Sequence, residues 1–190
     1  MTELEQHIKS NFGIIQPEDL QTIGSLFKEQ QMKRGDFFLQ AGEQCKRLSF
    51  MHSGLMRMYA NTDSKEVTQW ISTPGYFVTD LSSFLFEKPA RFYIQALSDC
   101  AFYTISRENY QRIGHLVPHW HELEKLFLAK CFTLLEDRIF MHLSMSAEER
   151  YQLFFEQNKE LFNQVPLQYL ASMLGMTPET FSRIRKKPLS

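Results

Sequence analysis

The chain has 190 residues, of which 43% are hydrophobic, and a formal net charge of −1. This composition argues against a disordered chain and against a protein that coats nucleic acid through a large positive charge. The three cysteines, Cys45, Cys100 and Cys131, lie far apart without a Cys-x-x-Cys pair, so we expect neither a disulfide framework nor a zinc ribbon. Residues 1–10 do not resemble a signal peptide, and no apolar stretch is long enough to span a membrane. We therefore expect a cytoplasmic protein without membrane contact.

The first part of the chain, residues 1–31, is predicted to be helical because its apolar residues recur at helical spacings. From 32 to about 105, short apolar runs alternate with turns that contain Gly, Asn, Asp or Pro. These runs lie at 37–39, 48–51, 55–59, 67–71, 92–97 and 101–105. Many short strands at this spacing predict an antiparallel sandwich, jelly roll or barrel.

A long helix is predicted over 119–144, with two apolar rows along it. One row is Trp120, Leu123, Phe127, Cys131 and Leu134, and the other is Leu128, Phe132, Leu135, Ile139 and Leu143. With two apolar rows, one side of the helix can pack on its own domain while the other forms a homodimer seam. Alternatively, the whole helix is buried in one core. A second helix is predicted over 147–162, where Ser146 and Glu149 have the spacing of a capping box.

A helix-turn-helix is predicted at 167–186. Ala171 is the small residue that lets the second helix pack closely, and Gly175, four residues later, suits a turn with positive φ. Leu170, Leu174, Met176, Phe181 and Ile184 are predicted to face the shared core. Any one of these residues is weak evidence, but their combination favours this motif over a solvated basic helix.

The second helix of this motif is predicted to begin at Thr177, itself a candidate DNA-binding residue, with Pro178 at its first position. Glu179, Ser182 and Arg183 fall on one face and are the candidates for contacts with base edges in the major groove of double-stranded DNA. Glu179 also has the spacing to hold the Arg183 guanidinium. Arg185, Lys186 and Lys187 are better placed for phosphates.

At this point the chain resembles the Crp/Fnr family of bacterial transcription regulators. The resemblance rests on four motifs, which run along most of the chain. They are Lys33-Arg34-Gly35-Asp36 with Ala41-Gly42-Glu43, then His52-Ser53-Gly54-Leu55-Met56-Arg57, then Pro74-Gly75-Tyr76-Phe77, and finally Glu179 to Arg183. The length and the stretch 146–151 resemble the short members found in Bacteroidetes-type bacteria.

The resemblance implies an α+β chain in three parts. These are a β-roll sensor domain of the cyclic nucleotide-binding type (1–118), a dimerisation helix (119–144) and a DNA-binding helix-turn-helix domain (145–190). Family members with a full wing carry a β-hairpin after the recognition helix. Only four residues follow Lys186, so we expect this wing to be truncated, absent or built from earlier residues.

The ligand pattern departs from that of cyclic-AMP-binding members, in which Gly-Glu-Leu is followed about ten residues later by an Arg. The matching stretch here is Asp80, Leu81 and Ser82, with Ala90 at the Arg position and Arg91 one residue beyond. A shift of one residue in a strand points the side chain to the other face. We therefore keep Asp80, Leu81, Ser82 and Arg91 as candidate ligand residues, but expect an effector other than cyclic AMP, or none.

Other chemistry is less well supported. The family's iron–sulfur sensors use an N-terminal cysteine cluster, and no cysteine precedes Cys45, so no such cluster is expected. His115, His119, His121 and Glu124 resemble the metal-binding pattern of cupins, but two His two residues apart on a helix diverge. We expect no metal site, no cofactor and no enzymatic activity.

The sequence therefore predicts a homodimeric DNA-binding regulator with an unknown small-molecule effector, and RNA polymerase is a candidate partner. Two alternatives remain. One is a nucleotide- or small-molecule-binding module with vestigial DNA binding. The other is a cupin-like metalloprotein.

Overall fold

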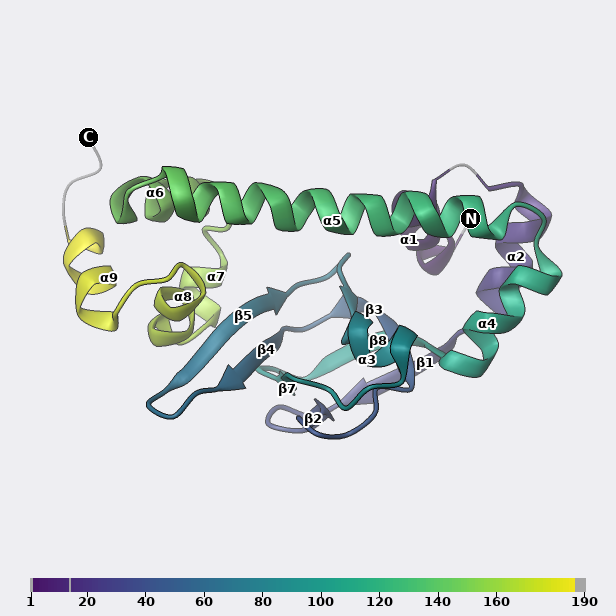
Figure 1. Cartoon of the computed structure of the whole chain (residues 1–190), viewed down its shortest axis with the longest axis horizontal. Helices are drawn as coiled ribbons and strands as arrows, with labels where there is room; N and C mark the ends of the chain where they lie inside the picture. The colour runs from purple at the N-terminus through teal and green to yellow at the C-terminus, as the bar shows by residue number, and fades with distance from the viewer. Residues whose placement is uncertain (1, 14, 187–190) are drawn as a thin grey trace. The chain divides into compact units, whose positions relative to one another are not determined.

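The computed structural model describes residues 2–13 and 15–186 (Figure 1). The chain forms two compact units, one made of Met1–Met58 and Ile71–Phe132 and the other of Tyr59–Trp70 and Thr133–Ser190. Within the described residues, the helices are α1 (Glu3–Phe12), α2 (Pro17–Ser25), α3 (Leu81–Phe86), α4 (Arg107–Leu116), α5 (Trp120–Ser144), α6 (Ala147–Gln157), α7 (Leu161–Gln164), α8 (Leu167–Met173) and α9 (Pro178–Arg185). The strands are β1 (Lys28–Met32), β2 (Phe37–Leu39), β3 (Arg47–Ser53), β4 (Met56–Asn61), β5 (Glu66–Ser72), β6 (Phe77–Val78), β7 (Tyr93–Ala96) and β8 (Cys100–Ser106).

These strands form two four-stranded sheets, as the short apolar runs predicted. One sheet has the order β1-β8-β3-β6 and the other β2-β7-β4-β5. The pairs β1–β8, β3–β8, β3–β6 and β2–β7 are antiparallel. Strands β4 and β5 each begin in one unit and end in the other, so their hairpin belongs by sequence to both.

The prediction of helix up to residue 31 is wrong for 28–31, which belong to β1. This strand has no apolar alternation, and most of its side chains are exposed. It is held by its ladder to β8, in which Lys28 is opposite Thr104 and Met32 opposite Cys100. Backbone hydrogen bonds to a neighbour far away in the sequence cannot be predicted from local periodicity.

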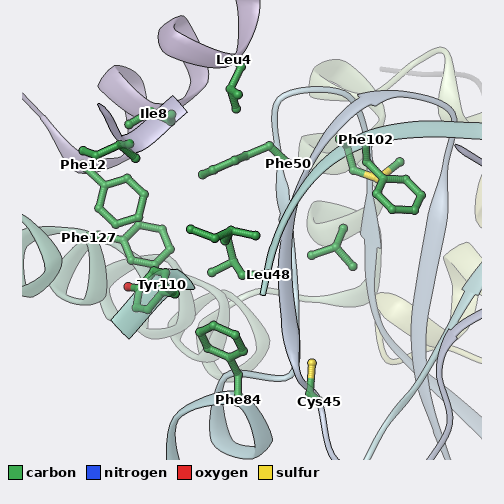
Figure 2. Close-up of a cluster of buried hydrophobic side chains, with 14 of the residues drawn as sticks. Leu4, Ile8, Phe12, Cys45, Leu48, Phe50, Phe84, Phe102, Tyr110 and Phe127 are labelled. Atoms are coloured by element: carbon green, nitrogen blue, oxygen red, sulfur yellow. The ribbon is translucent and has the colours of Figure 1, made fainter. Parts of the chain in front are cut away.

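The core of the first unit lies where α1 and the start of α5 pack on the β3–β8 sheet (Figure 2). The rings of Phe12 and Phe127 stack with centroids 4.5 Å apart, and Phe12 meets Phe50 edge-on at 6.5 Å. Phe50 is fully buried. Large aromatic rings in offset and edge contacts contribute more than their buried area alone.

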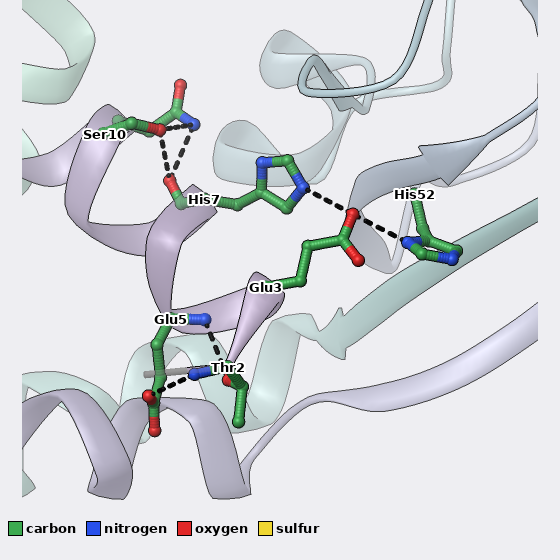
Figure 3. Close-up of polar contacts among 7 residues, drawn as sticks. Thr2, Glu3, Glu5, His7, Ser10 and His52 are labelled. Carbon is green, nitrogen blue, oxygen red and sulfur yellow. Dashed lines mark hydrogen bonds and ion pairs between the residues drawn. The ribbon is translucent and has the colours of Figure 1, made fainter.

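The N-terminal helix is also fixed by polar contacts (Figure 3). Thr2 and Glu5 form a capping box at its start, with hydrogen bonds of 3.2 and 2.8 Å. The carboxylate of Glu3 lies 2.7 Å from Nδ1 of His52 on β3 and 3.5 Å from Nε2 of His7. Its acceptance of a hydrogen bond from His52 lowers the pKa of Glu3.

The helix predicted over 147–162 is two helices, because α6 ends at Gln157 and α7 begins at Leu161. Asn158 leaves helical geometry at φ −138° and ψ 40°, and its side chain donates to the carbonyl of Phe154 at 3.1 Å. Helices α3 and α4 were not predicted. The start of α6 was predicted correctly, because Ser146 and Glu149 form the expected capping box.

Candidate functional site

Helices α8 and α9 form the predicted helix-turn-helix in the second unit. Ala171 is fully buried, and Gly175 occupies the turn with φ +68°. Of the residues predicted to face the shared core, four are buried and Met176 is half-buried. The four are Leu170, Leu174, Phe181 and Ile184. Tyr151 of α6 closes this core with its ring centroid 5.1 Å from that of Phe181.

The start of α9 is defined by Thr177 and Pro178, as the sequence predicted. The Thr177 hydroxyl accepts a hydrogen bond from the backbone N–H of Thr180 at 3.2 Å, and Pro178 occupies the first turn. The Glu179 carboxylate accepts from its own backbone N–H and from the Thr177 hydroxyl, and both lower the pKa of Glu179. This carboxylate is therefore ionised and turned toward the N-terminal end of α9.

The predicted groove-facing residues are all exposed: Glu179, Ser182 and Arg183 lie on the side of α9 opposite Phe181 and Ile184. Arg185 and Lys186 are also exposed, and Lys187 lies outside the described residues. The suggestion that Glu179 holds Arg183 is not supported, because the hydrogen bonds of Glu179 go to the helix start. The guanidinium of Arg183 is thus left to face the solvent.

Several residues that the sequence did not single out contact the turn of this motif. Arg150 of α6 donates from Nε to the carbonyl of Leu174 at 3.1 Å, and Arg138 of α5 donates to that of Met173 at 2.9 Å. Ser172 Oγ accepts a hydrogen bond from the backbone N–H of Thr68 at 2.9 Å. Long-range contacts of this kind have no local sequence signal.

The four predicted ligand residues lie in and around α3. Asp80 is buried and caps α3, where Oδ1 accepts from the backbone N–H of Ser83 at 3.0 Å. Oδ2 accepts from the backbone N–H of Arg91 at 3.2 Å. Both carboxylate oxygens are therefore engaged with the protein's own backbone. Of the other two, Leu81 is half-buried and Ser82 is exposed.

The side chains at positions 90 and 91 differ in burial, as the sequence suggested, although both residues precede β7. Ala90 is buried, whereas Arg91 is exposed and its guanidinium lies 4.6 Å from the ring centroid of Phe92. The side chain of Arg91 thus lies against an aromatic neighbour, and only its backbone is joined to Asp80.

A second arginine, Arg107, also contacts the residues around α3. Its Nη2 donates to the carbonyl oxygens of Cys45 at 2.5 Å and Ser83 at 3.0 Å, and Nη1 lies 3.3 Å from the Glu87 carboxylate. The Ser83 hydroxyl accepts from the Cys45 N–H at 2.8 Å and donates to the Lys88 carbonyl at 2.6 Å. The residues around α3 are therefore cross-linked by hydrogen bonds that need no ligand.

The second apolar row of α5 is largely exposed in the single chain. The exposed fractions are 62% at Phe132, 46% at Leu135, 60% at Ile139 and 81% at Leu143. These residues recur every three or four positions and form one continuous stripe. An apolar stripe of this length on a helix is typical of a protein–protein interface.

The histidines near the start of α5 form separate pairs with carboxylates. His119 Nδ1 lies 3.4 Å from Glu122, and His121 Nδ1 lies 3.4 Å from Glu124. Across the residues that the structure describes, no three His, Cys, Asp or Glu side chains are grouped as metal ligands.

With this geometry in place, comparison with known proteins identifies the class. Residues 29–114 match the family of the cyclic nucleotide-binding domain. The matched range carries nearly all of the two four-stranded sheets, including the part of the β4–β5 hairpin that belongs to the second unit. No curated protein sequence matches the chain.

Solved structures extend the likeness to nearly the whole chain. The catabolite activator protein of Thermus thermophilus is 21% identical with a TM-score of 0.59, over 94% of this chain and 84% of that one. The c-di-GMP-responsive global regulator CLP of Xanthomonas campestris is 16% identical with a TM-score of 0.68, over 90% of each chain. FixK2 of Bradyrhizobium japonicum is 16% identical with a TM-score of 0.68, over 84% of this chain and 82% of that one. The chain has the α+β fold of the Crp/Fnr regulators, and the resemblance inferred from the sequence is confirmed at the level of the fold.

Proposed function

We propose that the chain is a DNA-binding transcription regulator of the Crp/Fnr type, rather than an enzyme, and that its β-roll senses an effector or condition. The observation that carries this proposal is the two-sided character of α9. Phe181 and Ile184 anchor the helix in its core, while Glu179, Ser182 and Arg183 face outward. A short exposed helix held this way has the shape and polarity to enter a major groove.

Each exposed residue then has a chemical role. The Arg183 guanidinium can donate two hydrogen bonds to guanine O6 and N7, and the ionised Glu179 carboxylate can accept from cytosine N4. Ser182 can donate or accept. Arg185, Lys186 and Lys187 neutralise phosphates and supply affinity without sequence preference.

The proposal is tested by measuring the binding of genomic promoter fragments to the purified protein by fluorescence anisotropy. We expect a subset of fragments to bind more tightly than the rest, and Arg183→Ala to reduce that preference by losing it at the base pair that Arg183 contacts, while binding is retained. Arg112→Ala, on the exposed side of α4, is the matched control and should change neither. An unchanged preference in Arg183→Ala would overturn the assigned role, and uniformly weak binding by the parent would favour a sensor module with vestigial DNA binding.

The proposed active form is a homodimer joined through the apolar stripe of α5. Leu135, Ile139 and Leu143 provide the seam of a two-helix contact. Ile139→Glu places a carboxylate in that seam and should shift the protein to monomers in analytical ultracentrifugation. Asp137→Lys, which changes an exposed residue on the opposite side of the same helix, should leave the dimer intact. A parent chain that sediments as a monomer would contradict this part of the proposal.

The effector is proposed to be something other than cyclic AMP held by Asp80 and Arg91. The support is that the Asp80 carboxylate already binds two backbone N–H groups, while the Arg91 side chain is exposed. A thermal-shift screen with cyclic nucleotides and small metabolites tests this directly. Stabilisation by cyclic AMP that is lost in Arg91→Ala would overturn it.

On this proposal the protein acts in the cytoplasm on chromosomal DNA, and RNA polymerase is its downstream partner. No helix in the described ranges has the length and apolar character to cross a membrane. In vitro transcription from a bound promoter, with and without the protein, would establish whether it changes initiation.

A further inference from the structure

Arg138 lies toward the C-terminal end of α5, within the second unit. Its Nη2 donates a hydrogen bond to the carbonyl of Met173 at 2.9 Å. Its guanidinium carbon also lies 5.3 Å from the ring centroid of Trp70 on β5. One half-buried cation therefore contacts a strand residue and the helix-turn-helix at the same time.

The chemistry of the two partners suits a guanidinium. Met173 is the last residue of α8, where helix carbonyls lack partners within the helix and carry partial negative charge. The Trp70 ring offers a negative face, and a planar guanidinium can stack on it while its N–H groups still donate outward. Burial lowers the pKa of Arg138, so these contacts replace water around the charge.

Other contacts fix the same turn. Arg150 donates to the carbonyls of Leu174 at 3.1 Å and Met145 at 2.6 Å. A Cβ added to Gly175 would lie 3.4 Å from Cδ2 of His142. Side chains of α5 and α6 therefore contact the turn, although Gly175 itself is exposed.

The β4–β5 hairpin reaches this turn through its backbone as well. The N–H of Thr68 donates to Ser172 Oγ at 2.9 Å, in α8 one residue before Met173. Strand β5 continues from Trp70 into Ile71 and Ser72 of the first unit, where it belongs to the β2-β7-β4-β5 sheet. A strand of the sensor sheet is therefore bonded at its other end to the helix that precedes α9.

We propose that Arg138 is a positioning residue for α9: by binding Trp70 and Met173 together, it ties the helix-turn-helix to the β4–β5 hairpin, so that a displacement of these strands is passed to the recognition helix. The proposal rests on the proposed DNA-binding function for its consequence, but its structural part stands on the contacts alone. Through this contact, a movement of the sensor sheet reaches α9 by way of the β4–β5 hairpin, in addition to the long helix α5. Arg138 itself touches no base and no phosphate in this account.

The test compares Arg138→Gln, which removes the charge and the planar cation, with Arg138→Lys, which keeps a charge. Arg112→Gln is the same substitution at an exposed site on α4. Backbone hydrogen exchange, followed by mass spectrometry, is the readout that does not require DNA. In Arg138→Gln we expect faster exchange confined to 66–70 and 170–177, with the β3–β8 sheet unchanged. Faster exchange throughout the chain would indicate a merely structural role and overturn the proposal, as would unchanged exchange at both segments.

DNA affinity provides the second readout. Arg138→Gln should weaken binding to a preferred fragment by about tenfold while leaving the order of preference among fragments intact. Arg138→Lys should bind with intermediate affinity, and Arg112→Gln like the parent. A loss of preference, as expected for Arg183→Ala, would place Arg138 at the bases and overturn the positioning role. If the parent shows no preferred fragment, the proposed function fails. The exchange data would still support or overturn the proposed connection of Trp70 to the turn through Arg138.

Discussion

The carboxylate of Asp80 accepts a hydrogen bond from the backbone N–H of Arg91 at 3.2 Å, across a loop that begins with α3. Asp80, a candidate ligand residue in the sequence, thus fixes the loop itself. Its second oxygen caps α3 through Ser83. The carboxylate at this position therefore stabilises α3 and the loop that follows it.

Replacing Asp80 should destabilise the fold around α3. Asp80→Asn retains an acceptor for Ser83 but presents an amide donor to the Arg91 N–H, which should lower the free energy of unfolding by about 1–3 kcal/mol. Urea unfolding measures the change. Asp63→Asn, at an exposed turn residue, is the control and should be neutral. A neutral Asp80→Asn that also loses effector binding would show that the carboxylate serves the ligand instead.

Gly175→Ala should destabilise the helix-turn-helix by about 1 kcal/mol. The backbone there has φ +68°, which an L side chain adopts at a cost, and the added Cβ would lie 3.4 Å from His142. Gly24→Ala in α2 makes no contact within 4 Å and should be neutral or slightly stabilising. Thermal unfolding of both variants gives the comparison, and equal effects at the two glycines would contradict the assigned turn geometry.

Lys186→Gln should weaken all DNA binding by a similar factor, whatever the sequence. A phosphate contact releases a counterion, so the slope of log affinity against log salt should fall by about 1. Anisotropy titrations at several salt concentrations measure it for preferred and unrelated fragments. A change in preference without a change in slope would assign Lys186 to the bases.

Stability at low pH should depend on Glu3. Because the His52 hydrogen bond lowers the pKa of folded Glu3, its contribution is present above the unfolded-state value of 4.5 and is lost as the pH falls through the lowered pKa. The melting temperature of Glu3→Gln should therefore be below that of the parent at pH 6 and approach it in the acid range. Glu156→Gln, at an exposed residue of α6, should show no such convergence.

Elements with a local signal were predicted well from the sequence. The runs of apolar residues identified β2, β3, β4, β5, β7 and β8 to within about two residues. Gly175 identified the turn before α9, and Thr177 and Pro178 identified the start of this helix. Caps, turn glycines and strand alternation act within a few residues, so they are visible in one sequence. The confirmed resemblance rests on the same local motifs.

Features that depend on distant partners were not predictable. Strand β1 exists because β8, far away in the sequence, pairs with it. The contact of Arg138 with Trp70 joins residues far apart in the chain and has no sequence pattern. In the ligand region, the sequence showed the altered residues but not that Asp80 binds the Arg91 backbone.

The central claim is that the exposed face of α9 recognises a DNA sequence, and selection from a random duplex library tests it most directly. The parent chain should enrich an inverted repeat whose half-sites are centred about one helical turn, roughly 10 base pairs, apart. The Arg183→Ala protein, selected in parallel, should lose the preference at the position that Arg183 contacts. Failure of the parent to enrich any sequence, or identical enriched sequences from both proteins, would contradict the account.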